Sequence, residues 1–515
     1  MRSLLPPPRL AALSAALLTA VGCAPVAPAP APVPASGFAV TSRRALVARI
    51  DSMVNVPEFR NSHWGILIVD PERGDTLYSR NAGKLFMPAS NQKILTGAVA
   101  LARLGADYRF RTAFLASGPV QDGVLQGDLL VMGSGDPSVS ESMHRDAMLP
   151  LRQVAESLYA RGIRRIAGTV TSGRDAFPGD LYGFGWAYDD FDYAYSAPID
   201  ELVFNESFST VALHGTTPGQ PPRTVVTPSP RATAVRLEAV TVAARDTSAR
   251  IQYFGAVGAP GDSIRNVVRI TGTIAAGDSV RISVAHRDPA GAYLNALTAA
   301  LQARGIVVGG TRAQAADGTG LPAAGDTLYV LHSPPLREIL PVFEKPSQNQ
   351  IGEVLFRTLG LEATGAGTPQ AGRRIVEEQL VAWGADTAGF AVRDGSGLSR
   401  HDYVTPETIV RVLDAMRQHP DFRVFYDALP IAGVDGTIRT RMRDTPAMNN
   451  LRGKTGTLDK ARALSGYVTT ADGRLLLFST ISNNHTVPTR FVERVQDAIG
   501  AMLAASRLSE LTASR

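Results

Sequence analysis

Cysteine and lysine are both scarce in this chain. Cys23 is the single cysteine in 515 residues, so the sequence offers no disulfide framework, and no H-E-x-x-H pattern indicates a metal site. Lysine and arginine together number 52, yet only five of them are lysines. Because arginine keeps its proton in proteins whereas a buried lysine can become neutral, the few lysines are the candidates for a basic catalytic group.

Blocks of charge and long apolar runs are scarce as well. Charged residues make up 19% of the chain, the net charge is +5, and no Lys/Arg-rich run occurs, so nucleic acid is not indicated as a partner. The apolar fraction of 44% is typical of a soluble globular protein, and the length suits roughly two to four domains or one elaborated domain. The apolar stretch 10–21 near the N-terminus is too short to span a bilayer comfortably.

This apolar stretch indicates a bacterial lipoprotein signal. Arg2 and Arg9 flank its start and it ends in T-A-V-G-C at 19–23, so we expect 1–22 to be a signal peptide and Cys23 to be lipidated. An ordinary secretory signal, which would release a soluble periplasmic protein, stays open as the alternative. The segment 23–39 is rich in alternating Ala and Pro, which favours a stiff, extended tether.

Three short motifs follow one another along the chain: Ser90-Asn91-Gln92-Lys93, Ser347-Gln348-Asn349 and Lys454-Thr455-Gly456-Thr457. Together they supply a nucleophile, two amines, a second hydroxyl and an amide. A serine acyl-transfer enzyme needs this set of groups when lysine, rather than histidine, is its base. Each motif alone has an ordinary structural explanation as a helix cap or a turn, but all three in this order favour catalysis.

The sequence around Ser90 predicts how nucleophile and base meet. Apolar residues recur at helical spacing over 91–104, and Gly105 ends the pattern. Ser90 therefore lies at the start of a helix, with Lys93 on the same face three residues later. Burial and the positive charge of Lys454 would keep Lys93 neutral, so that it accepts the hydroxyl proton.

The second motif supplies a hydroxyl and an amide. Ser347 is expected to relay a proton to the leaving amine, and Asn349 to orient Lys93 or to bind a substrate amide. His401 stands next to Asp402 and suggests a Ser-His-Asp site, but a lysine-based site needs no histidine.

The third motif is suited to holding the substrate. The hydroxyls of Thr455 and Thr457 beside Lys454 form a natural cradle for a carboxylate. Gly456 has no side chain, so a substrate backbone can lie along the strand edge there. The backbone amides of Ser90 and Thr457 are the expected oxyanion hole.

The patterning predicts an α+β fold interrupted by an insertion. Helical segments and two late strands, at 466–468 and 475–481, indicate a discontinuous catalytic domain over 40–112 and 288–510. The stretch 113–287 between its parts is rich in Gly, Thr, Val and Pro with short alternating apolar runs, which predicts a mostly β insertion.

The motifs, their wide spacing and four further segments resemble the bacterial penicillin-binding proteins of the D-alanyl-D-alanine carboxypeptidase/endopeptidase family. The resemblance extends over about 40–508 and implies the serine DD-peptidase/β-lactamase-like fold, an antiparallel sheet flanked by helices, with a large insertion after the first motif. The four further segments are Gly127–Pro137, Tyr195–Pro198, Asp394–Arg400 and Leu429–Thr437.

The resemblance implies an activity and a set of site residues. It implies hydrolysis of the terminal D-Ala-D-Ala bond of peptidoglycan stem peptides and of D-amino-acid cross-links through an acyl-Ser90 intermediate. It also implies acylation of Ser90 by β-lactams, and no metal or organic cofactor. Gln348 stands where Asp is common in the family. Catalysis is assigned by resemblance to Ser90, Lys93, Ser347, Asn349 and Lys454, and substrate binding to Thr455, Gly456 and Thr457, with Asp190 and Arg400 as further contacts.

The expected location agrees with this chemistry. A lipid-anchored periplasmic protein on a stiff tether can reach the cell-wall mesh. Ala24 follows Cys23 in place of the Asp that often retains lipoproteins in the inner membrane, which favours attachment to the outer membrane.

Two other functions stay open. One is a β-lactamase or esterase of the same superfamily, against which stand the wide separation of the first two motifs and the lack of a clear Glu-containing loop that would activate water. The other is a scaffold or wall-binding lipoprotein on an inactive fold, for which a broken motif is expected, whereas every essential position is filled.

Overall fold

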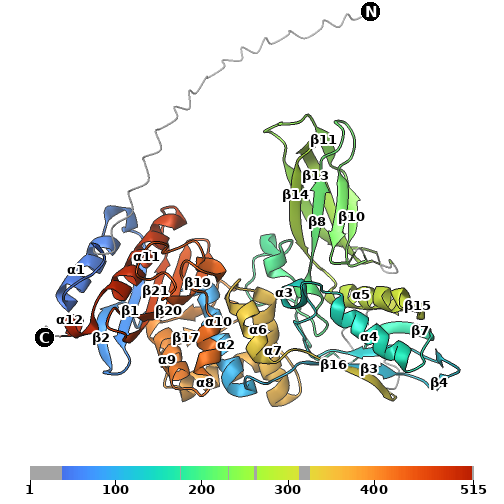
Figure 1. Ribbon diagram of the computed structural model, residues 1–515, viewed down its shortest axis with the longest axis horizontal. Helices are drawn as coiled ribbons and strands as arrows, with labels where there is room; N and C mark the ends of the chain where they lie inside the picture. Colours follow the sequence, from blue (N-terminus) through green and yellow to red (C-terminus); the bar gives the residue numbers. More distant parts are fainter. Residues whose placement is uncertain are drawn as a thin grey trace, which may run out of the picture.

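The computed structural model describes residues 37–512 except 174, 230, 260, 261, 263 and 313–324. The predicted signal peptide, the lipidation site Cys23 and most of the tether lie outside the described residues. Among the helices of the described part, none is both long and apolar enough to cross a membrane. The chain forms two bodies side by side, and a β-rich arm rises from the second body (Figure 1).

A five-stranded antiparallel sheet forms the centre of the first body, with the strand order β19-β20-β21-β1-β2. The hairpin near the N-terminus therefore pairs with strands near the C-terminus, for example Ile66 with Thr480. Strand β21 is buried along almost its whole length, since helices cover both faces of the sheet. The strands are β1 (His63–Asp70), β2 (Asp75–Arg80), β19 (Arg452–Leu458), β20 (Ala461–Thr469) and β21 (Leu475–Asn483).

Helices pack on the two faces of this sheet as two separate cores (Figure 1). One face carries the terminal helices α1 (Arg43–Val54), α11 (Thr489–Ala505) and α12 (Leu508–Thr512). The other face carries α2 (Gln92–Leu104), α6 (Leu336–Glu344), α7 (Asn349–Thr364), α8 (Pro369–Ala382), α9 (Pro406–Arg417) and α10 (Phe422–Ala428), beside the short pair β17 (Phe390–Ala391) and β18 (Tyr403–Val404). Helix α2 is buried from Gln92 to Leu101, so a lysine in its first turn has no access to bulk solvent.

A seven-stranded mixed sheet forms the second body, in the order β16-β3-β6-β7-β5-β4 with β15 paired to β7. Its strands are β3 (Arg111–Ala116), β4 (Val120–Gln121), β5 (Val124–Leu125), β6 (Leu129–Met132), β7 (Arg165–Ser172), β15 (Val307–Arg312) and β16 (Thr327–His332). The helices α4 (Leu149–Ala160) and α5 (Pro289–Ala303) belong to the same body, whereas Met143 of the short helix α3 (Glu141–His144) packs against the core that contains α6.

This body extends beyond the predicted insertion range 113–287. Helix α5 shares a hydrophobic core with α4, and β15 and β16 belong to the sheet that contains β3. Helical periodicity over 292–304 predicts a helix but does not tell which core its apolar side joins. The boundary at residue 287 is therefore corrected to the end of β16, at His332.

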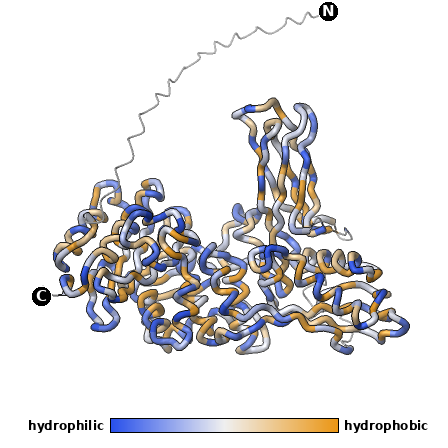
Figure 2. The backbone as a smooth tube through the Cα atoms, in the orientation of Figure 1, coloured by the Kyte–Doolittle hydropathy of each residue, from blue (hydrophilic) through white to orange (hydrophobic). Residues whose placement is uncertain are grey.

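The arm is an all-β unit with its own small core. Apolar and polar stretches alternate along its strands, as expected for sheets with one covered face (Figure 2). A three-stranded sheet contains β8 (Phe208–His214), β9 (Arg223–Thr227) and β14 (Ser279–Ala285). A four-stranded sheet contains β10 (Ala234–Leu237), β11 (Val240–Val242), β12 (Ile251–Val257) and β13 (Asn266–Ala275).

Candidate active site

Ser90 lies in the 3-10 turn η3 (Ala89–Asn91), which leads directly into α2. The preceding Ala89 has a φ of 48°, in the left-handed region that residues with a side chain rarely adopt. Lys93 follows in the first turn of α2, and its Nζ lies 2.9 Å from Ser90 Oγ. The structure therefore brings the first two predicted residues within hydrogen-bond distance.

Three oxygen atoms surround the fully buried Lys93 amine. Besides Ser90 Oγ, they are Asn349 Oδ1 at 2.7 Å and the backbone oxygen of Ser396 at 2.6 Å. An ammonium group donates to all three. A neutral amine donates its two N–H bonds to the amide and backbone oxygens and keeps its lone pair for the Ser90 hydroxyl proton. The three oxygen atoms are therefore suitable hydrogen-bond partners for the Lys93 amine both before and after it takes up a proton.

Burial lowers the pKa of Lys93 from its usual value to about 8. The nearby carboxyl groups of Asp394, Glu344, Glu353 and Asp402 oppose this shift because their negative charges stabilise the ammonium form. With a pKa of about 8, the amine is neutral in a useful fraction of molecules near neutral pH.

The second amine belongs to Lys454, on β19. Its Nζ lies 2.7 Å from Ser347 Oγ and 3.2 Å from the backbone oxygen of Thr455. Burial, together with the positive charge of Lys93, lowers the pKa of Lys454 to about 7. Ser347 itself has a φ of 66°, so its backbone is held in an unusual conformation at the turn between α6 and α7.

Asn349 connects the site to the segment between β7 and β8. Its Oδ1 accepts from Lys93, and its Nδ2 donates to the backbone oxygen of Tyr195 at 2.6 Å. The Tyr195 hydroxyl in turn donates to Asp190 Oδ1 at 2.6 Å. Tyr195 is 43% exposed and stacks on Tyr193. Asp190, predicted as a substrate contact, is therefore linked to the Lys93 amine through two intervening residues, Asn349 and Tyr195.

The glycine of the third motif packs against the turn that carries Ser90. A Cβ atom on Gly456 would lie 2.3 Å from the backbone oxygen of Pro88 and 3.1 Å from the backbone nitrogen of Asn91. Asn91 also ties the two elements together, since its Nδ2 donates to the backbone oxygen of Lys454 at 2.7 Å. The prediction explained Gly456 by space for a substrate backbone; close approach of β19 to η3 is a further requirement for glycine at this position.

The two threonines of the same strand face different surroundings. Thr455 is buried and its Oγ1 donates to Thr437 Oγ1 at 2.7 Å. Thr457 is exposed. Thr437 belongs to the segment that resembles a family signature, but its contact with Thr455 has no signal in the sequence.

A loop between α8 and α9 supplies the backbone oxygen that Lys93 contacts. Asp394 accepts from the backbone N–H groups of Gly397 and Ser399 at 2.6 and 2.7 Å. Glu353 of α7 accepts from the backbone N–H of Ser396 at 2.8 Å. Sequence reasoning missed these roles, because the 394–400 segment was recognised only as a signature. Arg400, predicted as a substrate contact, is exposed at the end of this loop.

Gln348, the residue at which the second motif departs from the common pattern, bridges the two bodies. Its Nε2 donates to Glu206 Oε2 at 2.7 Å, and its Oε1 accepts from the backbone N–H of Gln350 at 2.7 Å. Glu206 lies in a run of three residues, 205–207, that all have positive φ. The sequence gives no sign of this contact, since the two residues are 142 positions apart.

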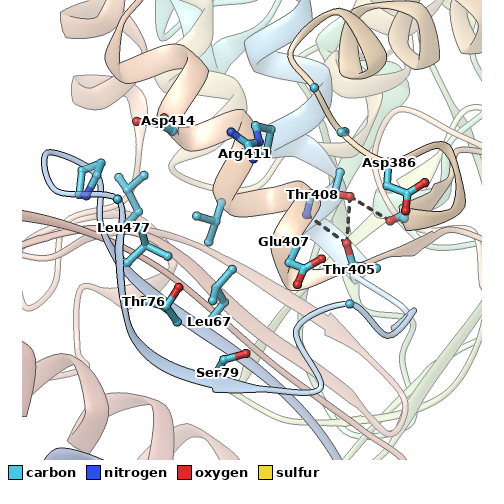
Figure 3. A pocket seen from close by; sticks show the side chains of 18 of the residues that line it. Leu67, Thr76, Ser79, Asp386, Thr405, Glu407, Thr408, Arg411, Asp414 and Leu477 are labelled. Atoms are coloured by element: carbon cyan, nitrogen blue, oxygen red, sulfur yellow. Dashed lines mark hydrogen bonds between the residues drawn. The ribbon is translucent and has the colours of Figure 1, made fainter. Parts of the chain in front are cut away.

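A separate cavity of about 490 Å³ lies between the β1–β2 hairpin and α9 (Figure 3). Its lining includes Leu67, Thr76, Glu407, Arg411 and Leu477. Strand β2 is at the opposite edge of the sheet from β19, and none of the lining residues belongs to the three motifs. This cavity is therefore not the place where a substrate meets Ser90.

Comparison with known proteins adds independent information. Residues 46–506 match the D-Ala-D-Ala carboxypeptidase 3 (S13) family. The chain is 34% identical to a D-alanyl-D-alanine carboxypeptidase of Actinomadura sp. (strain R39), over 92% of this chain and 87% of that protein. It is 26% identical to the D-alanyl-D-alanine carboxypeptidase DacB of Haemophilus influenzae, over 85% of this chain and 88% of that protein.

The solved structures agree with the sequence matches. Penicillin-binding protein 4 (dacB) from Haemophilus influenzae superposes with a TM-score of 0.74 at 25% identity, covering 87% of this chain and 97% of that one. The same protein complexed with a β-lactam superposes with a TM-score of 0.70 at 24% identity, covering 88% of this chain and 98% of that one.

Proposed function

Because this chain belongs to the D-Ala-D-Ala carboxypeptidase 3 (S13) family, we propose that it is a serine-type D-alanyl-D-alanine carboxypeptidase and endopeptidase that uses Ser90 as its nucleophile. Its substrates are peptidoglycan stem peptides that end in D-Ala-D-Ala and D-amino-acid cross-links between such peptides. One observation carries the assignment of the nucleophile: Ser90 Oγ lies 2.9 Å from a fully buried lysine amine whose pKa is lowered to about 8.

Acylation begins with transfer of the Ser90 hydroxyl proton to Lys93. The Ser90 oxygen attacks the carbonyl carbon of the penultimate D-Ala, and the carbonyl oxygen becomes an oxyanion. The backbone N–H groups of Ser90 and Thr457 stabilise this negative charge, as donors held in place before the reaction. Lys93, now an ammonium group, keeps Asn349 Oδ1 and the Ser396 backbone oxygen as acceptors.

Collapse of the intermediate requires a proton on the leaving nitrogen. Ser347 donates its hydroxyl proton to this nitrogen and takes a proton from Lys454, whose Nζ lies 2.7 Å from Ser347 Oγ. The C–N bond breaks, D-Ala leaves, and the acyl group stays on Ser90. At this stage Lys454 is neutral and Lys93 is charged.

Hydrolysis of the acyl-enzyme runs through the same groups in reverse. A water molecule takes the place of the leaving amine and gives its proton to Ser347, which passes one to neutral Lys454. When the C–O bond to Ser90 breaks, Lys93 returns its proton to the Ser90 oxygen. Both lysines are then back in their initial protonation states, and the cycle needs no metal or organic cofactor.

The substrate is held mainly by the third motif. The positive charge of Lys454 and the hydroxyls of Thr455 and Thr457 bind the terminal carboxylate, and Gly456 keeps β19 close to the Ser90 turn. Asp190 and Arg400 contact more distant parts of the stem peptide. β-Lactams acylate Ser90 by the same first step, with the lactam nitrogen in place of the leaving amine.

We place the protein in the periplasm. The signal at 1–22 and the lone Cys23 support a lipid anchor, Ala24 favours the outer membrane, and the Ala/Pro-rich tether would let the enzyme reach the wall. Growth with a radiolabelled fatty acid tests the anchor. The full chain should become labelled and Cys23→Ala should not. Absence of label from the wild-type chain would support the soluble secreted alternative.

Release of D-alanine from a peptide that ends in D-Ala-D-Ala tests the proposed activity. Wild-type protein should release D-alanine, Ser90→Ala should not, and Ser52→Ala, a change of an exposed serine on α1, should behave as wild type. The same peptide with an L-Ala-L-Ala end should be left intact. Release by Ser90→Ala at the wild-type rate would refute Ser90 as the nucleophile.

A further inference from the structure

Glu344 is a buried carboxyl group that the proposed mechanism does not use. It is the last residue of α6, three positions before Ser347, and its side chain is fully buried. Neither of its carboxyl oxygens has a hydrogen-bond partner within the described part of the chain. An unpartnered buried carboxyl group is costly, and an apolar side chain at this position would avoid that cost.

The fold leaves space for this carboxyl group next to the helix of the nucleophile. A Cβ atom on Gly97 would lie 2.5 Å from Glu344 Oε1, so an ordinary side chain on that helix would displace the carboxyl group. Gly97 follows Lys93 by one helical turn on the same face of α2. Glycine inside a helix is less favourable than alanine by about 1 kcal/mol, so both residues of this contact are unfavourable choices on local grounds.

Two positive charges, on two different elements, act electrostatically on the buried Glu344 carboxyl group. They are Lys93 of α2 and Lys454 of β19. The neighbouring Lys345 points elsewhere, since its Nζ lies 2.6 Å from Asp435 Oδ2. Burial raises the pKa of Glu344 to about 8, in the range of the two amines, so all three groups exchange protons at similar pH.

Further charges act on the two amines but not as strongly on Glu344. The charges of Asp394, Glu353 and Asp402 raise the pKa of Lys93, and the charge of Arg462 lowers that of Lys454. Glu344 differs from the three other acids because it acts on both amines.

We propose that Glu344 is a positioning residue of the two-lysine site, and that its negative charge sets the pH range in which Lys93 and Lys454 share one proton, so that one amine can accept a proton while the other donates one. This inference rests on the proposed function, because it concerns the two amines that move protons in acylation. When Glu344 is ionised, it stabilises the protonated forms of both lysines. When its charge is removed, both amines lose their protons at lower pH.

The predicted signature is a shift of the pH profile rather than a simple loss of rate. Acylation requires neutral Lys93 and protonated Lys454, so the rate falls on the acidic side, where both amines are protonated, and on the alkaline side, where both are neutral. Glu344→Gln keeps the size of the side chain and removes its charge. Both limbs should therefore move to lower pH, by about one unit if the carboxylate acts at the distance of a close ion pair.

The test measures the acylation rate with a chromogenic cephalosporin from pH 5 to pH 10. It compares the wild-type chain, Glu344→Gln, Glu344→Leu and the control Asp136→Asn, which removes a buried carboxyl group of the second body. Both Glu344 variants should shift the two limbs to lower pH, and the control should leave them in place. Because either neutral variant is sufficient, failure of one of them to fold leaves the other as the test.

Two results would overturn the proposal and are distinguishable from each other. Normal acylation of wild-type Ser90 with unmoved limbs in the folded Glu344 variants would refute the role of Glu344 alone. Absence of Ser90 acylation in the wild-type chain would refute the proposed function, and the role of Glu344 with it.

Discussion

Replacing Gln348 by Asp, the residue that is common at this position in the family, should damage this particular protein. Asp is an excellent helix cap, so the contact with the backbone N–H of Gln350 is retained. The amide that donates to Glu206 Oε2 at 2.7 Å is lost, however, and a second carboxylate takes its place. Glu206 is only 4% exposed, so water screens the two negative charges poorly.

The expected penalty follows from this geometry. Two like charges about 4 Å apart repel by about 4 kcal/mol at the effective dielectric constant of a partly buried site. Relaxation of the shorter Asp side chain away from Glu206 reduces this value, so we expect a loss of about 2–4 kcal/mol.

Urea unfolding at pH 7 measures this penalty, together with the acylation rate at the same pH. Gln348→Asn is the matched control, because it keeps a neutral amide and a capping oxygen. Adding Glu206→Gln to Gln348→Asp should restore most of the stability, since the new amide donates to Asp. Wild-type stability of Gln348→Asp at pH 7, or no rescue by the second change, would refute the proposed bridge between the two bodies.

Three further outcomes follow from the geometry of the site. Gly456→Ala places a Cβ atom 2.3 Å from the Pro88 backbone oxygen, a clash that no change of rotamer relieves. Acylation of Ser90 should therefore fall by at least about 100-fold in stopped-flow measurements with a chromogenic cephalosporin. Lys93→Met removes the base and should slow acylation by about 10² to 10⁴-fold; a rate within a factor of three of wild type would contradict its role. The wild-type acylation rate should rise from pH 5 to a maximum between about pH 7 and pH 8 and fall again at higher pH, because Lys93, with a pKa of about 8, must be neutral while Lys454, with a pKa of about 7, must be protonated. A flat rate between pH 5 and pH 9 would contradict this.

The helix of the nucleophile could be predicted from the sequence because its signals are local. Apolar periodicity over 91–104 and the stop at Gly105 fixed both its extent and the side on which Lys93 lies, and α2 spans Gln92–Leu104. The last strand was also predictable, since its long apolar run indicated 475–481 and β21 spans Leu475–Asn483, whereas only 466–468 of β20 (Ala461–Thr469) was predicted.

Long-range pairing was not predictable from a single sequence. The Ser396 backbone oxygen contacts Lys93 from a loop whose backbone N–H groups donate to Glu353 and Asp394, and these partners are distant in sequence from Lys93. The bridge between Gln348 and Glu206 depends on how the second body sits beside the first. Likewise, the periodicity of α5 indicates a helix, but its membership of the second body is decided by tertiary packing.

Intact-mass spectrometry after incubation with benzylpenicillin tests the central claim most directly. The protein lacking residues 1–36 should gain the mass of one intact drug molecule, and Ser90→Ala should gain none. Absence of an adduct on the wild-type protein, with the drug left intact, would contradict Ser90 as an activated nucleophile. Hydrolysed drug without an adduct would instead indicate a β-lactamase, and an adduct that persists in Ser90→Ala would place the nucleophile elsewhere.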